Sequence, residues 1–257
     1  MSFSDKVQAF NAQLLRAAEQ LISACKLNVT ARGMLDPKVL AYLLLCRTIT
    51  NFEGTLLLAK HRLVVEARTL ARCCVENVFL AGGLHEQGDA FADRMKADDD
   101  AGRQQRLKFA QSTSDIFDSL EPEMRSAVAD FLDRATKSNL LSPKSASAVS
   151  AFKTAYLAYS QFSGDAAHAS LTALARHWRR AEDRTVEVVV RPDVSQAELD
   201  QTLLFAGMAV LGLLGVIDEM FGHVAPSGTL VRLRDELQTL QDEEGAIVAG
   251  MPAEAAR

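Results

Sequence analysis

The sequence has few residues that interrupt helices and lacks the common catalytic motifs. Its 257 residues include 6 prolines and 14 glycines, which is too few for an all-β protein with many turns. It has no GxGxxG fingerprint, no P-loop and no GxSxG nucleophile elbow. No standard motif therefore assigns nucleotide binding or serine-hydrolase chemistry to the chain.

The four cysteines lack the spacing of a redox or metal motif. Cys25, Cys46, Cys73 and Cys74 form no CxxC pair and lie in apolar segments. Reduced core thiols are the simplest interpretation, and they indicate a cytoplasmic protein. Because residues 1–10 show no basic stretch followed by an apolar one, we expect no signal peptide.

The chain also lacks a strong charge and a long apolar run. Its net charge of −5 does not support a nucleic-acid partner. The longest apolar run, residues 203–217, is shorter than the roughly 20 residues that cross a bilayer, and Asp218 and Glu219 follow it directly. We expect a buried helix there and no membrane association.

Helical periodicity dominates what is present. It predicts an all-α bundle of about seven to nine helices, with at most one short strand or hairpin. We expect a single helical domain over residues 1–244 and a disordered tail over residues 245–257. Asp36 and Pro37 mark the start of one helix.

Two further helices have recognisable ends. The glycine pair Gly82-Gly83 predicts the end of the helix that contains residues 66–83. Ser195 and Glu198 form a predicted capping box that opens a long helix through Phe221.

The long helix and a strand-like segment point to oligomerisation. Gly207, Gly212 and Gly215 each cost a helix about 1 kcal/mol relative to alanine, so we expect neighbouring helices to approach closely at all three. Residues 185–190 read as a strand without an obvious partner. It either pairs across a homodimer or is an extended connector.

The helix around residues 66–83 carries a regular line of charges. Arg68, Arg72 and Glu76 recur every fourth position, opposite an apolar core face. Phe79 and Leu80 lie on the charged side too, so we expect another helix to cover it partly. Covered charges must be paired. The arginines either form an interhelical salt bridge that fixes packing, or bind a ligand or substrate.

A second polar segment surrounds His168. We expect one helix to end near Tyr159. A second helix is expected to follow the segment 162–165, in which Ser163 is the natural N-cap, and this second helix should run to about Trp178. Ser163, Asp165 and His168 then lie on one helical turn, which does not give the geometry of a catalytic triad. His168 is either a core histidine or part of a pocket shared with Arg68.

No metal or cofactor site is predicted. The acidic residues Asp93 and 98–100 lack the glycine and glutamate spacing of a calcium loop. His61 and His85 lack the further ligands that a zinc site needs. We therefore expect no metal and no cofactor.

The two polar segments together resemble a bacterial, all-helical family of unknown function. That family combines an R-x3-R/S-x3-E helix with a later Y-x3-S-x4-H segment, here Arg68, Arg72 and Glu76 followed by Tyr159, Ser163 and His168. The resemblance covers about residues 37–222 and implies an all-α fold in which the two segments pair. It implies no activity.

A looser resemblance is to the HEPN helical domains of bacterial toxin and defence systems. Their RNases carry an arginine followed by a histidine after four to six residues, and this sequence departs from that spacing. The resemblance implies a shared bundle architecture.

Two functional hypotheses follow. In the first, the protein is a binding or interaction module, in which Arg68, Arg72, Glu76, Tyr159, Ser163 and His168 line a small polar pocket for an anionic small molecule or a partner carboxylate. In the second, it is a hydrolase acting on RNA or a nucleotide. His168 is then the general acid–base and Arg68 stabilises a phosphoryl oxyanion.

Overall fold

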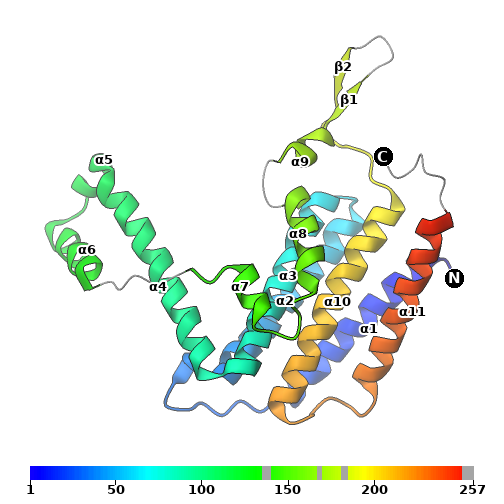
Figure 1. Cartoon of the computed structure of the whole chain (residues 1–257), viewed down its shortest axis with the longest axis horizontal. Helices are drawn as coiled ribbons and strands as arrows, with labels where there is room; N and C mark the ends of the chain where they lie inside the picture. The colour runs from blue at the N-terminus through cyan, green and yellow to red at the C-terminus, as the bar shows by residue number, and fades with distance from the viewer. Residues whose placement is uncertain (135–139, 167–169, 181–184, 251–257) are drawn as a thin grey trace.

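The computed structural model describes residues 1–134, 140–166, 170–180 and 185–250. Long helices pack side by side into a bundle, an arm of helices projects from it, and a short hairpin extends from one end (Figure 1). The bundle helices are α1 (Phe3–Ala24), α2 (Pro37–Lys60), α3 (Val64–Gln87), α8 (Ala155–Ala166), α10 (Gln196–Phe221) and α11 (Thr229–Gly250).

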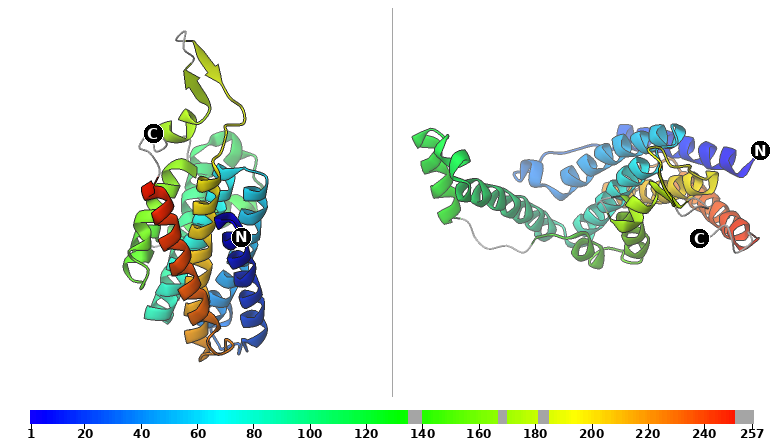
Figure 2. Two further views of the ribbon diagram at one scale, coloured as in Figure 1. Left: turned by 90° about the vertical axis from the view of Figure 1, so that its right-hand side faces the viewer. Right: turned by 90° about the horizontal axis from the view of Figure 1, so that it is seen from above.

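The other elements are shorter or lie outside the bundle. The arm consists of α4 (Asp89–Ser112), α5 (Ser114–Asp118) and α6 (Pro122–Arg134). The short elements are the 3₁₀ helix η1 (Gly33–Leu35), α7 (Pro143–Ala148), α9 (Leu171–Ala175), β1 (Trp178–Arg180) and β2 (Val186–Val188). Figure 2 shows the arm extending away from the bundle in a second view.

The predicted all-α class is confirmed. In the described part of the chain the only sheet is the β1–β2 hairpin. In the described residues, three short α-helices of five or six residues (α5, α7 and α9) add to the long helices that periodicity predicts. The start of α2 is also confirmed, since the Asp36 side chain accepts a hydrogen bond from the backbone N–H of Lys38.

Helix α10 is the core of the bundle. It packs against α1, α2, α3 and α11, and fully buried residues such as Leu213, Leu214 and Ile217 line it. It is long and apolar enough to cross a membrane, but most of that apolar window is buried against other helices. This is the pattern of a core helix in a soluble protein.

The glycine pair Gly82-Gly83 does not end α3, contrary to the prediction. The helix continues to Gln87. A Cβ atom on Gly83 would lie 2.3 Å from Cζ of Phe91, and one on Gly82 would lie 2.7 Å from Cβ of Ser150. These glycines therefore allow close packing of α4 and of the segment after α7 against α3.

The three glycines of α10 divide into two kinds. A Cβ on Gly207 would lie 2.8 Å from Asn11 Oδ1 of α1, which confirms the predicted close approach of a neighbouring helix. A Cβ on Gly212 would lie 2.9 Å from Phe152 Cε1, so the close neighbour there is the turn between α7 and α8 and not a helix. At Gly215 that prediction is wrong, because in the described part of the chain a Cβ there would meet nothing within 4 Å apart from the backbone of α10 itself.

The strand-like segment has a partner within the same chain. β2 pairs antiparallel with β1, in the register Trp178 with Val188 and Arg180 with Val186. The helix predicted to reach Trp178 ends at Ala175 instead. Trp178, Val186 and Val188 are exposed on the hairpin.

The C-terminal helix is longer than predicted. α11 runs to Gly250, six residues beyond the predicted domain end at 244. The remainder of the predicted tail, 251–257, lies outside the described residues.

Candidate functional site

The charged line of α3 is covered by α8 on one side and by the first turns of α10 on the other. Arg68, Arg72 and Glu76 all make contacts to residues of these helices or within α3. The expectation that another helix covers the charges is therefore met by two helices, and each arginine has its own carboxylate partner.

Arg68 is a buried residue that links α3 to α10 through an ion pair and a hydrogen bond. Its side chain is 9% exposed, and its Nη2 lies 3.4 Å from Glu198 Oε1. Its Nε donates a hydrogen bond to Thr202 Oγ1 at 3.2 Å, and the guanidinium lies over the Phe162 ring at 5.2 Å from its centroid. Burial of this cation is offset by a carboxylate, a hydroxyl and an aromatic face.

Glu198 is shared between two arginines. Besides Arg68, it accepts a 2.7 Å hydrogen bond from Nη2 of Arg176, which follows α9. The predicted capping box is therefore only half formed. The Ser195 side chain accepts from the backbone N–H of Glu198, but the Glu198 carboxylate turns to the two arginines.

Arg72, Glu76 and Tyr159 form a second cluster between α3 and α8. The Tyr159 hydroxyl donates a 2.6 Å hydrogen bond to Glu76 Oε1. Arg72 Nη1 lies 3.2 Å from the same oxygen and 3.3 Å from the Tyr159 hydroxyl. Two donors from different helices thus converge on one carboxylate oxygen. The Arg72 and Glu76 side chains are 21% and 28% exposed, so solvent reaches this cluster.

Tyr159 is held in an aromatic setting. Its ring stacks on Tyr156 with centroids 5.6 Å apart and meets the edge of Phe79 at 5.8 Å. Burial raises the pKa of the Tyr159 phenol, and its hydrogen bond to Glu76 raises the pKa further. The phenol is therefore a stable hydrogen-bond donor at neutral pH.

Within the described residues, one donor in this cluster has no hydrogen-bond partner. Nε of Arg72 is buried, and among the described residues it makes no hydrogen bond. An unpaired buried donor is unfavourable. This guanidinium therefore has hydrogen-bonding capacity left over after Glu76 and Tyr159 are satisfied.

The second predicted segment is only partly described. Ser163 is not an N-cap, because α8 continues through it to Ala166 and its hydroxyl donates to the Tyr159 backbone carbonyl at 2.8 Å. The predicted helix end near Tyr159 is therefore wrong. His168 lies outside the described residues, so its distance from Arg68 stays untested.

Sequence reasoning missed the residues that pair with the arginines from other elements. Glu198 and Thr202 are more than 120 positions from Arg68, so no local spacing connects them. The one usable signal was the covered face of α3, which required partners but could not identify them.

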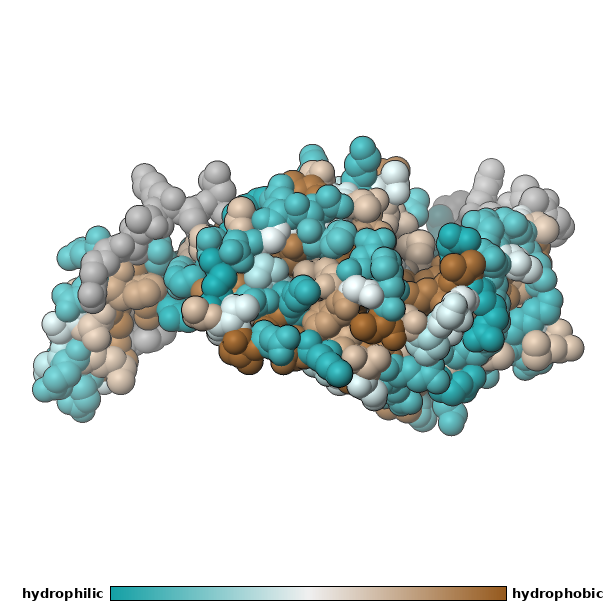
Figure 3. All heavy atoms as spheres, turned by 90° about the horizontal axis from the view of Figure 1, so that it is seen from below, coloured by the Kyte–Doolittle hydropathy of each residue, from teal (hydrophilic) through white to brown (hydrophobic). Residues whose placement is uncertain are grey.

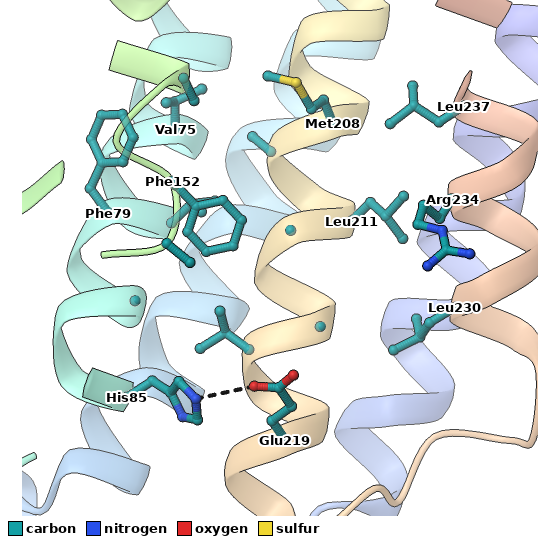
Figure 4. Close-up of a pocket in the computed structure, with 18 of the residues that line it drawn as sticks. Val75, Phe79, His85, Phe152, Met208, Leu211, Glu219, Leu230, Arg234 and Leu237 are labelled. Atoms are coloured by element: carbon teal, nitrogen blue, oxygen red, sulfur yellow. Dashed lines mark ion pairs between the residues drawn. The ribbon is translucent and has the colours of Figure 1, made fainter. Parts of the chain in front are cut away.

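An apolar groove lies beside the polar clusters. α10 forms its floor, α3 and the segment around Phe152 form one wall, and α11 forms the other (Figure 4). Its volume is about 530 Å³. From below, Figure 3 shows hydrophobic residues gathered over the middle of the bundle between hydrophilic ones.

These features define the class of protein: an all-α bundle whose charged α3 face is paired with α8 and α10. A family model described as a family of unknown function (DUF5677) matches residues 38–185, more than half of the chain. The chain belongs to this family. No curated protein and no solved structure matches it.

The family membership confirms the predicted resemblance to an uncharacterised domain family. The match ends at residue 185, earlier than the predicted limit near 222, and it includes α3 and α8 but not α10. The similarity to HEPN domains stays a prediction.

Proposed function

We propose that the protein is a binding module that holds an anionic ligand group, or a carboxylate of a partner protein, at the cluster of Arg72, Tyr159 and Glu76. The incoming anion takes the position of the Glu76 carboxylate. Arg68 and Glu198 hold α3 and α10 in place beside this site.

One observation carries the proposal. Glu76 Oε1 receives the Tyr159 hydroxyl at 2.6 Å and Arg72 Nη1 at 3.2 Å, so two donors already point at one position for an anionic oxygen. Donors that are fixed before binding cost little to order when the ligand arrives.

The incoming anion regains the contacts that the resident carboxylate gives up. Displacing Glu76 breaks its i,i+4 pair with Arg72, worth about 0.2–0.5 kcal/mol, and the Tyr159 hydrogen bond, worth about 0.5–1.5 kcal/mol. A displaced Glu76 regains water at the surface. The guanidinium, in contrast, is a flat fork that suits carboxylate and phosphate oxygens.

The hydrolase alternative is not proposed on these observations. It needs Arg68 to meet a phosphoryl oxygen, but the Arg68 guanidinium is engaged by Glu198 and Thr202. Its general base, His168, lies outside the described residues, so the alternative stays a prediction from sequence.

We also propose that the protein acts as a homodimer in the bacterial cytoplasm. Support for the location comes from the four cysteines, all of which are free thiols, as is usual in a reducing compartment. Support for the dimer comes from the hairpin, whose Trp178, Val186 and Val188 expose apolar surface that a second copy could cover.

Thermal unfolding tests the anion proposal. Oxalate and sulfate, each compared with chloride at constant ionic strength, are expected to raise Tm of the wild type. Saturation at 100 times Kd adds about 2.7 kcal/mol, and a chain of this size gains roughly 2–4 °C per kcal/mol. Arg72→Met should lose the rise.

A matched control separates the site from overall charge. Arg103→Met removes the same charge from an exposed i,i+4 pair on the arm, and it should keep the full anion effect. If neither anion raises Tm of the wild type, or if Arg72→Met responds as the wild type does, the proposal is wrong.

A further inference from the structure

We propose that the groove along α10 binds a small elongated molecule with an apolar body and a cationic head group, such as an alkylammonium. This goes beyond the proposed function, because it concerns a different site and a ligand of opposite charge. The groove is built from α3, the segment around Phe152, α10 and α11 (Figure 4).

Gly215 leaves the floor of the groove open. A glycine inside a helix costs about 1 kcal/mol relative to alanine. At Gly212 that cost has a structural reason, because Phe152 occupies the space of a Cβ. At Gly215 no neighbouring atom lies within 4 Å of where a Cβ would be, and Gly215 lines the groove. Its missing side chain gives room to the groove and to nothing else in the described structure.

The dimensions suit a small molecule. A volume of about 530 Å³ lies within the range of roughly 300–1,000 Å³ typical of ligand pockets. From Met208 to Glu219 the floor follows α10 for about 16 Å, at 1.5 Å per residue. A medium-length alkyl chain or a pair of fused rings fills such a space.

The lining defines the body of the ligand as apolar. Phe79 and Phe152 line the groove on the α3 side, and Met208 and Leu211 line it from α10 (Figure 4). Burial of an apolar body against them gives about 0.8 kcal/mol per CH₂ group, which corresponds to roughly fourfold in affinity. The apolar walls therefore supply affinity without selecting a head group.

The charges at one end select the head group. Glu86 and Glu219 line the groove together with His85, and His85 Nε2 lies 3.1 Å from Glu219 Oε2. Two carboxylates and one imidazole keep this end negative in either protonation state of the histidine. Such an end attracts a cation and repels an anion.

Arg234 does not reverse this preference. It lies on α11, away from His85 and Glu219 (Figure 4). Its side chain is 69% exposed and pairs with the neighbouring Asp235 at 3.0 Å. The guanidinium is thus already paired with a carboxylate at the solvent edge of the groove.

Two probes of equal chain length and opposite head-group charge test the proposal. Decyltrimethylammonium and decanoate are titrated into the full chain by isothermal calorimetry, both below the concentrations at which they form micelles. Decyltrimethylammonium is expected to bind, and decanoate is expected to bind at least about tenfold more weakly.

Two sets of variants locate the bound cation. Gly215→Leu places a good helix former in the open space, so the fold is kept, and it should weaken binding at least about tenfold. Replacing Glu86 and Glu219 together with glutamine should weaken it about two- to thirtyfold, because each exposed ion pair contributes a modest factor. Gly102→Leu on the arm, where the nearest atom is a flexible guanidinium, should bind as the wild type does.

Three results would overturn the proposal. They are the absence of wild-type binding, unchanged affinity in Gly215→Leu, and equal affinity for decanoate. Arg72→Met should bind decyltrimethylammonium normally. A failure at the groove therefore leaves the anion proposal intact, and a failure of the anion proposal leaves the groove intact.

Discussion

The two glycines Gly83 and Gly215 give a direct test of where the bundle is packed and where it is open. Both lie within long helices, so replacing either with alanine gains about 1 kcal/mol of helix propensity. This gain is common to the two variants and cancels when they are compared. The difference between them isolates the cost of the added methyl group.

The packing cost differs sharply between the two positions. At Gly83 the methyl would lie 2.3 Å from Cζ of Phe91, whose side chain is fully buried and cannot move aside. Overpacking of this kind costs about 1–3 kcal/mol. At Gly215 the methyl enters open space. The free energy of unfolding should therefore be about 1–3 kcal/mol higher for Gly215→Ala than for Gly83→Ala.

Urea unfolding followed by circular dichroism measures this difference. Gly215→Ala should have a higher midpoint than the wild type, and Gly83→Ala an equal or lower one, with unchanged slopes. Equal midpoints in the two variants would refute the reasoning. A lower midpoint for Gly215→Ala would show that something covers the groove in solution.

Three further predictions concern single contacts. Arg68→Met and Glu198→Gln should show a coupling free energy of about 1 kcal/mol in a double-mutant cycle measured by urea unfolding. A coupling free energy near zero would contradict the buried Arg68–Glu198 ion pair. Asp36→Ala should cost about 1 kcal/mol at pH 7. Because hydrogen bonds lower the pKa of the Asp36 carboxyl, its contribution is present above the unfolded pKa of about 4 and is lost as pH falls. The same urea assay at pH 3 should show a smaller difference than at pH 7, and an undiminished one would be inconsistent with a charged cap. Burial raises the pKa of the Cys74 thiol, so iodoacetamide followed by mass spectrometry should label the half-buried Cys25, Cys46 and Cys73 before Cys74; early labelling of Cys74 would contradict its burial.

Local signals in the sequence were enough to place the starts of α2 and α10. Asp36 before Pro37 is such a signal, because a side-chain cap and a proline act within one turn of the helix start. The prediction that Gly82-Gly83 ends the helix was wrong for a physical reason. Glycine can end a helix or can admit a neighbouring chain, and only the position of Phe91 distinguishes these roles.

The segment around Ser163 shows the same limit. Serine, glycine and aspartate in succession predict a break, yet α8 continues through them. Phe162 stacks on Phe205 of α10 with centroids 4.2 Å apart, and the Ser163 hydroxyl bonds back to the preceding turn. Tertiary packing of α8 outweighs the local preference for a turn.

The candidate site was predictable in outline. Phe79 and Leu80 among the charges of α3 indicated that a helix covers that face, and Tyr159 of α8 lies there. The identity of Glu198 as the partner of Arg68 was hidden, because its spacing from Ser195 suits a helix cap equally well. Pairing across more than 100 residues leaves no trace in local periodicity.

The most direct test of the binding proposal is the affinity of Glu76→Gln for oxalate, measured by isothermal calorimetry beside the wild type. If an anion takes the place of the Glu76 carboxylate, removing that competing charge frees Arg72 and keeps the Tyr159 donor. The proposal predicts that oxalate binds more tightly to Glu76→Gln, by about twofold or more for an i,i+4 pair. Weaker or unchanged affinity in this variant would contradict it.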